Sequence, residues 1–152
     1  MRRVSATIDI DASAQRVWDL YADVPGSPEW VPFVERILYV SGPPGEGQVY
    51  REQTRLVGIR DVAEWRVVEW DPPRRQVQVS TDKGMDAQLV IEVEPLEPLD
   101  AGRSRLRQDA IFESRSGGPV GRLQELVFSI VGRRGVTAAV QAAKRHLEHE
   151  TV

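Results

Sequence analysis

The sequence predicts an α+β fold in which a large antiparallel sheet packs against one long C-terminal helix. Residues 119–148 hold the only long helical pattern of the chain, with apolar residues three and four positions apart. Residues 34–112 have the pattern of six strands separated by turn residues, and no helix of useful length fits between them. Parallel neighbours would need a helical crossover, so we expect antiparallel pairing. The sheet then supplies the apolar surface that the long helix needs.

The N-terminal part is predicted to form one strand followed by two small helices. Apolar and polar residues alternate over residues 4–10, which indicates a strand with one buried face. Ser13 is a suitable N-cap for a helix over residues 14–22. A serine, a proline and a glutamate then give the composition of a helix start, so a second small helix carries Trp30 and Phe33.

The turn at Val57-Gly58 predicts the pairing of two strands. A two-residue turn places Leu56 opposite Ile59 and Tyr50 opposite Trp65. Because side chains alternate along a strand, Glu52 and Asp61 fall on the same inner face. The outer face then pairs Arg51 with Glu64, which is favourable, and Arg55 with Arg60, which is not. The six strands are expected at residues 35–40, 48–57, 59–70, 76–81, 86–94 and 104–112.

The inner face of this sheet is predicted to be mainly apolar, with a few polar exceptions. We place Trp70 outward, and we expect Glu69 and Gln108 inward together with Tyr50 and the two carboxylates above. A buried polar group without a partner is costly, so inward polar residues are candidates for function. The apolar inward residues are expected to be Val67, Val77, Val79, Leu89, Ile91, Val93, Leu106, Ala110 and Phe112.

The long helix is predicted to begin at Pro119, where a missing N–H costs nothing. Its first apolar stripe contains Leu123, Leu126, Val127 and Ile130, and its second contains Val136, Ala139, Val140, Ala143 and Leu147. The two stripes are out of phase, and Gly132 and Gly135 lie between them. Glycine is unfavourable inside a helix, so we expect a bend or break there, with the two halves burying different faces.

Composition bounds the class of protein. The 152 residues suit a single domain, here residues 1–152, and 41% hydrophobic with 28% charged residues indicates a globular chain. The net charge of −3 disfavours a nucleic-acid partner. The chain has no cysteine, which excludes thiolate metal sites and favours the cytoplasm. We expect no signal peptide, because no apolar segment follows the N-terminus, and no transmembrane segment.

In the order of its elements the sequence resembles the polyketide cyclase/dehydrase-like families of the START and Bet v 1 superfamily, the helix-grip fold. The resemblance covers nearly the whole chain and rests on the order and spacing of several short motifs. They are Ile8-Asp9-Ile10-Asp11-Ala12-Ser13, Val17-Trp18-Asp19-Leu20, Asp23, Pro28-Glu29-Trp30, Gly47, Trp65-Arg66-Val67-Val68-Glu69, Asp71-Pro72-Pro73-Arg74 and Ala143-Lys144-Arg145-His146-Leu147-Glu148.

The resemblance implies an internal hydrophobic cavity between sheet and long helix, roofed by the two small helices. This superfamily hosts both carriers and enzymes, so the fold alone does not decide the function. The first hypothesis is binding of an apolar or aromatic small molecule of polyketide, lipid or isoprenoid type. The residues expected to bind it are Trp30, Phe33, Tyr50, Trp65, Val67, Leu89, Ile91, Gln108, Phe112, Leu123 and Val127.

The second hypothesis is a cyclase, aromatase or dehydratase in which Glu52 or Asp61 is the general acid or base, because a buried carboxylate has a raised pKa. The aromatase/cyclase members carry a serine and an arginine projecting from a tryptophan-rich strand. Here Arg66 is predicted to point outward and no serine is near it, which disfavours cyclisation. The third hypothesis is an interaction module whose pocket is filled by its own side chains.

Cofactors and further partners are constrained less by the residues. We expect no cofactor and no metal. His146 and His149 are three residues apart on the long helix, but a solvated helix end explains them more simply than a metal site. A homodimer through the second helix stripe is an open alternative to packing on the sheet. Arg122, Arg133 and Arg134 would suit an acidic partner or lipid head groups if they are not simply solvated.

Overall fold

The computed structural model describes residues 1–97 and 100–149. Its order is strand, small helices, six strands and long helix, as the sequence predicts. The elements are β1 (Arg2–Ile10), α1 (Ala14–Ala22), the 3₁₀ turn η1 (Val24–Gly26), α2 (Ser27–Trp30), β2 (Val34–Val40), β3 (Val49–Leu56), β4 (Ile59–Asp71), β5 (Arg75–Ser80), the 3₁₀ turn η2 (Asp82–Gly84), β6 (Met85–Glu97), β7 (Asp100–Ser114) and α3 (Gly118–His149).

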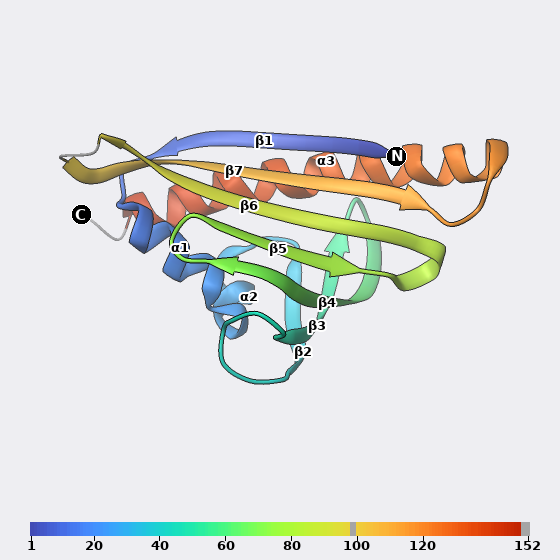
Figure 1. Cartoon of the computed structure of the whole chain (residues 1–152), viewed down its shortest axis with the longest axis horizontal. Coiled ribbons are helices and arrows are strands. Elements are labelled where there is room, and N and C mark those ends of the chain that lie inside the picture. The colour runs from blue at the N-terminus through green and yellow to red at the C-terminus, as the bar shows by residue number, and fades with distance from the viewer. Residues whose placement is uncertain (98–99, 150–152) are drawn as a thin grey trace.

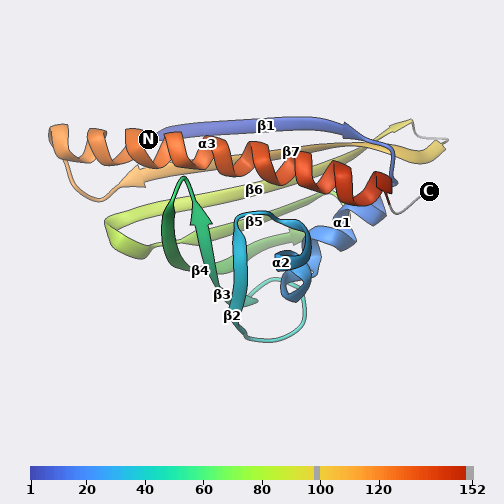
Figure 2. The same cartoon turned by 180° about the vertical axis from the view of Figure 1, so that it is seen from behind.

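The seven strands form one antiparallel sheet in the order β1-β7-β6-β5-β4-β3-β2 (Figure 1). The predicted antiparallel arrangement is therefore confirmed, and β1 joins the sheet beside the last strand, with Arg2 opposite Phe112. The sheet curls so that α3 lies along its β1–β7 side while β2, β3 and β4 turn beneath the helix (Figure 2). Strands β6 and β7 are longer than predicted, and the centre of the predicted turn at 95–102 lies outside the described residues.

The small helices begin with the predicted cap. The Ser13 hydroxyl accepts a hydrogen bond from the Arg16 N–H at 3.2 Å, which satisfies an otherwise unpaired donor at the start of α1. Asp23 follows α1 and accepts from the Gly26 N–H at 3.3 Å, so the chain turns at once into α2. The two helices close one end of the curled sheet (Figure 2).

The β3–β4 hairpin has the predicted register. Leu56 pairs with Ile59, Glu52 with Ala63 and Tyr50 with Trp65. The outer-face ion pair of Arg51 and Glu64 forms at 3.6 Å. Arg55 and Arg60 do lie opposite each other, and the Glu35 carboxylate, 2.9 Å from Arg60 Nε, reduces their repulsion.

Beyond Val67, strand β4 departs from the predicted alternation. A bulge between Val67 and Glu69 puts Val67 opposite Gln78 and Trp70 opposite Gln76. A bulge adds one residue to one strand, which reverses the faces of all residues after it. Trp70 therefore points inward, contrary to the prediction, and its ring meets that of Trp18 edge-on at 4.9 Å.

The same shift corrects two further predictions. Glu69 pairs with Val77 on the outer face and bonds Arg75 at 3.2 Å, so it does not face inward. On β5 the inward residues are Gln76 and Gln78, which oppose Ile91 and Leu89, while Val77 and Val79 take the other face. The predicted inward positions of Val77 and Val79 are therefore wrong by one residue.

Helix α3 runs without interruption from Gly118 to His149, so the predicted break is wrong, and a bend stays a prediction. The glycines serve close packing instead. A Cβ at Gly132 would lie 2.6 Å from the Phe112 ring, and one at Gly135 would lie 3.3 Å from Leu56 Cδ2. The out-of-phase stripes have a different origin: the second is buried on the sheet, whereas the first is largely exposed.

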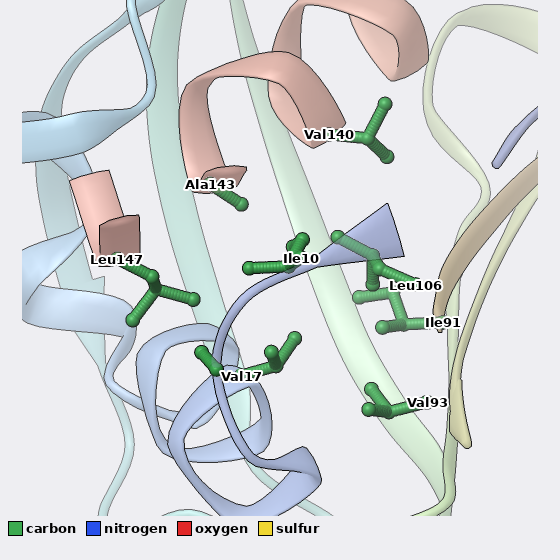
Figure 3. Close-up of a cluster of buried hydrophobic side chains, with 9 residues drawn as sticks. Ile10, Val17, Ile91, Val93, Leu106, Val140, Ala143 and Leu147 are labelled. Atoms are coloured by element: carbon green, nitrogen blue, oxygen red, sulfur yellow. The ribbon is translucent and has the colours of Figure 1, made fainter. Parts of the chain in front are cut away.

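The core lies where the second half of α3 meets β1, β6, β7 and α1. Its central side chains come from all five elements and converge in Figure 3. Burial of such side chains contributes roughly 1.5–3 kcal/mol each. The cluster contains Ile10, Ala12, Val17, Ile91, Val93, Leu106, Val140, Ala143 and Leu147.

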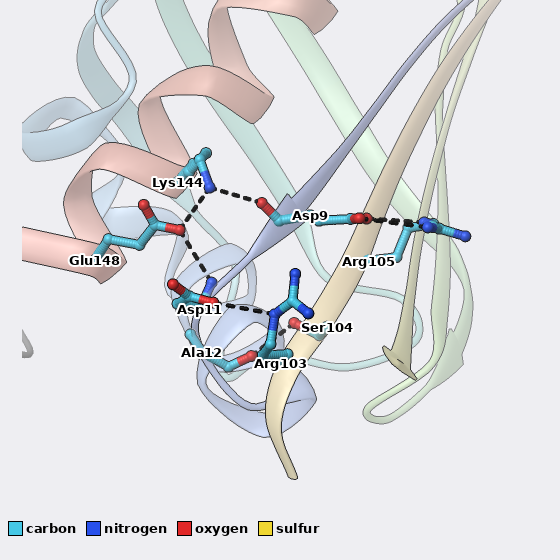
Figure 4. A network of polar contacts seen from close by, with 8 residues as sticks. All are labelled: Asp9, Asp11, Ala12, Arg103, Ser104, Arg105, Lys144 and Glu148. Atoms are coloured by element: carbon cyan, nitrogen blue, oxygen red, sulfur yellow. Dashed lines mark hydrogen bonds and ion pairs between the residues drawn. The ribbon is translucent and has the colours of Figure 1, made fainter. Parts of the chain in front are cut away.

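Polar contacts tie the end of α3 to the end of β1 (Figure 4). Lys144 Nζ donates to the Asp9 carbonyl at 2.9 Å and pairs with Glu148 at 2.6 Å. Glu148 in turn accepts from the Asp11 N–H at 3.0 Å. Together with the core cluster, these bonds hold the second half of the helix against the sheet.

Candidate functional site: a cavity between sheet and helix

A cavity of about 450 Å³ lies between the inner face of the sheet and α3. The inner face of the β3–β4 hairpin supplies one wall, α3 a second, and α1 and α2 close one end. Most of the lining is apolar, and it includes Trp30, Phe33, Trp65, Leu89 and Phe112. The predicted cavity is therefore present.

Glu52 is a carboxylate in the cavity wall whose ionised form is disfavoured by burial. It lies on β3, is half-buried and lines the cavity. Burial raises the pKa of Glu52 from 4.5 to about 7, although the hydrogen bond from Trp65 opposes this rise. Trp65 Nε1 donates to Glu52 Oε1 at 3.2 Å, and Oε2 has no hydrogen-bond partner within the described residues.

Three polar side chains are linked by hydrogen bonds that run from Tyr50 along the inner face of the sheet. Tyr50 donates its hydroxyl proton to Gln78 Oε1, and Gln78 Nε2 donates to Gln76 Oε1 at 2.9 Å. Burial, followed by the nearby charge of Glu52, raises the pKa of the Tyr50 phenol, so it stays protonated. This series of hydrogen bonds ends at Gln76 Nε2, which has no acceptor among the residues that the structure describes.

A second polar group lies toward the small helices. The Tyr21 hydroxyl of α1 donates to Gln108 Oε1 at 2.9 Å. The ring of Tyr21 meets that of Trp30 edge-on at 5.0 Å. Ser27 Oγ and Trp30 Nε1 are buried without a partner in the described part of the chain, and both residues line the cavity. This end therefore holds two buried polar atoms without a hydrogen bond within the described residues.

The structure places most of the predicted site residues in the cavity wall. Both carboxylates, Glu52 and Asp61, line it, and Asp61 lies one inward pair nearer the hairpin turn. Two predictions need correction. Val67 faces inward but is only 1% exposed and does not reach the cavity, and Leu123 is 62% exposed on the outside of α3. The predicted residues in the wall are Trp30, Phe33, Tyr50, Glu52, Asp61, Trp65, Leu89, Ile91, Gln108, Phe112 and Val127.

Sequence reasoning missed Tyr21 and Gln78 as lining residues. Tyr21 lies on α1, and the sequence does not show how α1 is placed relative to α2 and the sheet. Gln78 was not predicted to face inward because the sequence gives no sign of the β4 bulge. Within the described residues no group of three or more His, Asp or Glu side chains is suited to hold a metal ion, and no helix is long and apolar enough to cross a membrane.

A curled antiparallel sheet that grips a long C-terminal helix around a cavity defines the helix-grip class of proteins. The chain belongs to the polyketide cyclase/dehydrase and lipid transport family, whose sequence profile matches residues 1–148. An uncharacterized protein of Mycobacterium tuberculosis is 31% identical over 87 residues, a match that spans 55% of this chain and 59% of the mycobacterial protein.

Solved structures share the fold at lower identity. The ZhuI aromatase/cyclase from Streptomyces sp. R1128 has a TM-score of 0.83 at 22% identity, over 99% of this chain and 96% of that one. Norcoclaurine synthase from Thalictrum flavum, solved in complex with dopamine and hydroxybenzaldehyde, has a TM-score of 0.72 at 14% identity, over 97% of this chain and 87% of that one. At these identities the likeness shows the fold alone.

Proposed function

We propose that the protein binds an apolar or aromatic small molecule in this cavity, with an oxygen of the ligand at Glu52. The observation that carries the proposal is an apolar cavity of about 450 Å³ with one partly unsatisfied, protonatable carboxyl in its wall. Ligand sites typically enclose roughly 300–1,000 Å³ and orient their ligand with few polar groups. A polyketide, lipid or isoprenoid fragment has this character. A pocket filled by its own side chains, the third hypothesis, does not agree with a cavity of this size.

Glu52 would select for oxygen-bearing ligands. With a pKa of about 7 it is present in both protonation states near neutral pH. The protonated form donates a hydrogen bond to a carbonyl, and the ionised form accepts one from a hydroxyl. Because Trp65 already holds Oε1, the ligand contact falls to Oε2.

Binding is tested with 1-naphthol, an aromatic probe with one hydroxyl group, by quenching of tryptophan fluorescence. Trp30 and Trp65 line the cavity, so quenching reports on its occupation. Ala63→Phe fills the cavity beside Glu52 and should abolish quenching. The matched control is Val62→Phe, one residue away on the outer face, and it should bind as the original protein does. Equal binding by both variants would refute the cavity as the site.

A second candidate function, proton-transfer catalysis, is favoured by the pKa of Glu52 and by the second carboxylate, Asp61, in the same wall. Enolisation and dehydration of a poly-β-ketone need such an acid or base. Glu52→Gln should then retain ligand binding and lose turnover of a poly-β-ketone surrogate, and the original protein should show a pH–rate inflection near 7. Retained turnover in that variant would leave binding as the function.

A further inference from the structure

The first half of α3 exposes an apolar stripe beside the cavity. Leu123 is 62% exposed, Val127 48% and Ile130 55%. At spacings of four and three residues these side chains share one face of the helix. A long amphipathic helix normally packs its apolar face against the rest of the protein, as the second half of α3 does.

The tip of the β3–β4 hairpin adds apolar side chains at the other side of the same opening. Val57 is 49% and Ile59 57% exposed. Of the described residues that line the cavity, only Ile59 and Val127 are themselves exposed. We therefore place the mouth of the cavity between them. Figure 2 shows the hairpin tip beside α3. We define the mouth patch as Val57, Ile59, Leu123, Leu126, Val127 and Ile130.

Within the described part of α3, the charged residues beside the mouth patch that form no ion pair are all positive. Arg122, Arg133 and Arg134 are exposed and form no ion pair within the described residues, and Arg134 continues the line of Leu123 and Ile130 along the helix. The one acidic residue in this half, Glu125, is held by the N-terminal ammonium at 2.8 Å and by the Ser114 N–H at 2.9 Å.

We propose that the mouth patch docks on an anionic lipid bilayer, so that an apolar ligand passes between the bilayer and the cavity without crossing water. A helix with an aliphatic face flanked by arginines suits the interface of an anionic membrane. The proposal goes beyond ligand binding, and docking itself needs no ligand.

Two features of the patch favour a bilayer over a protein. Its exposed side chains are all aliphatic, whereas protein interfaces concentrate binding energy in Trp, Tyr and Arg, with Leu and Val under-represented. A second copy on the same patch would bring Arg122, Arg133 and Arg134 of both copies together with no acidic residue of the patch to pair with them. Lipid phosphates supply the missing negative charge.

Insertion is tested by site-specific fluorescence, because the chain has no cysteine of its own. Leu123→Cys and, as a control, the exposed Val68→Cys on β4 are labelled with an environment-sensitive NBD group. With vesicles of phosphatidylcholine and phosphatidylglycerol, the label at 123 should shift to the blue and brighten, and the label at 68 should not. No shift at 123, or an equal shift at both sites, overturns the proposal.

Co-sedimentation with the same vesicles measures affinity. Replacing Leu123 and Ile130 by Gln should weaken binding at least roughly a hundredfold, because two apolar side chains are removed from the bilayer. Replacing Arg122, Arg133 and Arg134 by Gln should weaken it roughly a hundredfold. A charge-matched control replaces three arginines of the sheet, Arg36, Arg51 and Arg66. Equal losses in both arginine variants would overturn a localised patch.

The remaining outcomes are also decisive. Sedimentation equilibrium shows whether the original protein is a dimer and whether the variant with Leu123→Gln and Ile130→Gln is a monomer. That result, without any vesicle binding, would assign the patch to a second copy and overturn the proposal. Since Leu123 and Ile130 do not line the cavity, this variant should still bind 1-naphthol. In this variant, retained 1-naphthol binding with lost vesicle binding supports docking. Failure of the original protein to bind 1-naphthol, with its vesicle binding intact, would refute ligand binding and leave the docking proposal standing.

Discussion

Replacing Glu52 with glutamine should make the protein more stable at neutral and alkaline pH than the original chain. The pKa of Glu52 is about 7 in the folded protein and 4.5 ordinarily, a difference worth about 3 kcal/mol. Below pH 4.5 the carboxyl is protonated in both states and has no effect. As pH rises from 4.5 to 7, the unfolded chain releases the proton while the folded protein retains it, so the original protein loses stability.

Urea unfolding, followed by circular dichroism from pH 4.5 to 8.5, measures this difference. The stability of Glu52→Gln minus that of the original protein should grow by about 3 kcal/mol across this range, roughly 6–12 °C in melting temperature at pH 8. Other carboxylates titrate equally in both proteins and cancel. The exposed Glu113→Gln is the control and should show a constant difference. A constant difference for Glu52→Gln would refute a dry cavity around its carboxyl.

Two further variants test how α3 is held. Gly132→Ala should destabilise the protein by about 1–3 kcal/mol because the new methyl group meets the Phe112 ring. A gain in stability of about 1 kcal/mol, which helix propensity alone would give, would show that the contact is not tight. Gly42→Ala, where nothing lies within 4 Å, is the control. Lys144→Met should lower the free energy of unfolding, measured by thermal unfolding, by about 1 kcal/mol, because it removes the hydrogen bond to the Asp9 carbonyl. An unchanged stability would mean that the core alone holds the end of the helix.

The parts of the fold that follow from local chemistry were predictable. The two-residue turn at Val57-Gly58 determines the register of β3 and β4, and with it the inward position of Glu52 and Asp61. The alternation of β1 and the Ser13 cap likewise depend on neighbouring residues alone. The hairpin register alone places both carboxylates on the same face before any tertiary contact is known.

The errors arose where tertiary contacts decide. The β4 bulge between Val67 and Glu69 leaves no mark in the hydrophobic pattern, and it moved Trp70 and Gln78 to the inner face. Gly132 weakens a helix by propensity but also permits the close approach of Phe112, and the sequence does not separate these two effects. An apolar stripe indicates burial, yet that of Leu123 stays exposed at the cavity mouth.

The pairing of β1 with β7 has a consequence for synthesis on the ribosome. The partner of Arg2 is Phe112, so the first strand emerges about 100 residues before the strand that completes it. At roughly 5–20 residues per second, β1 waits on the order of 5–20 s with an unpaired edge. An alternating apolar strand in that state is open to pairing with a neighbouring nascent chain, and the danger ends only when β7 has left the tunnel.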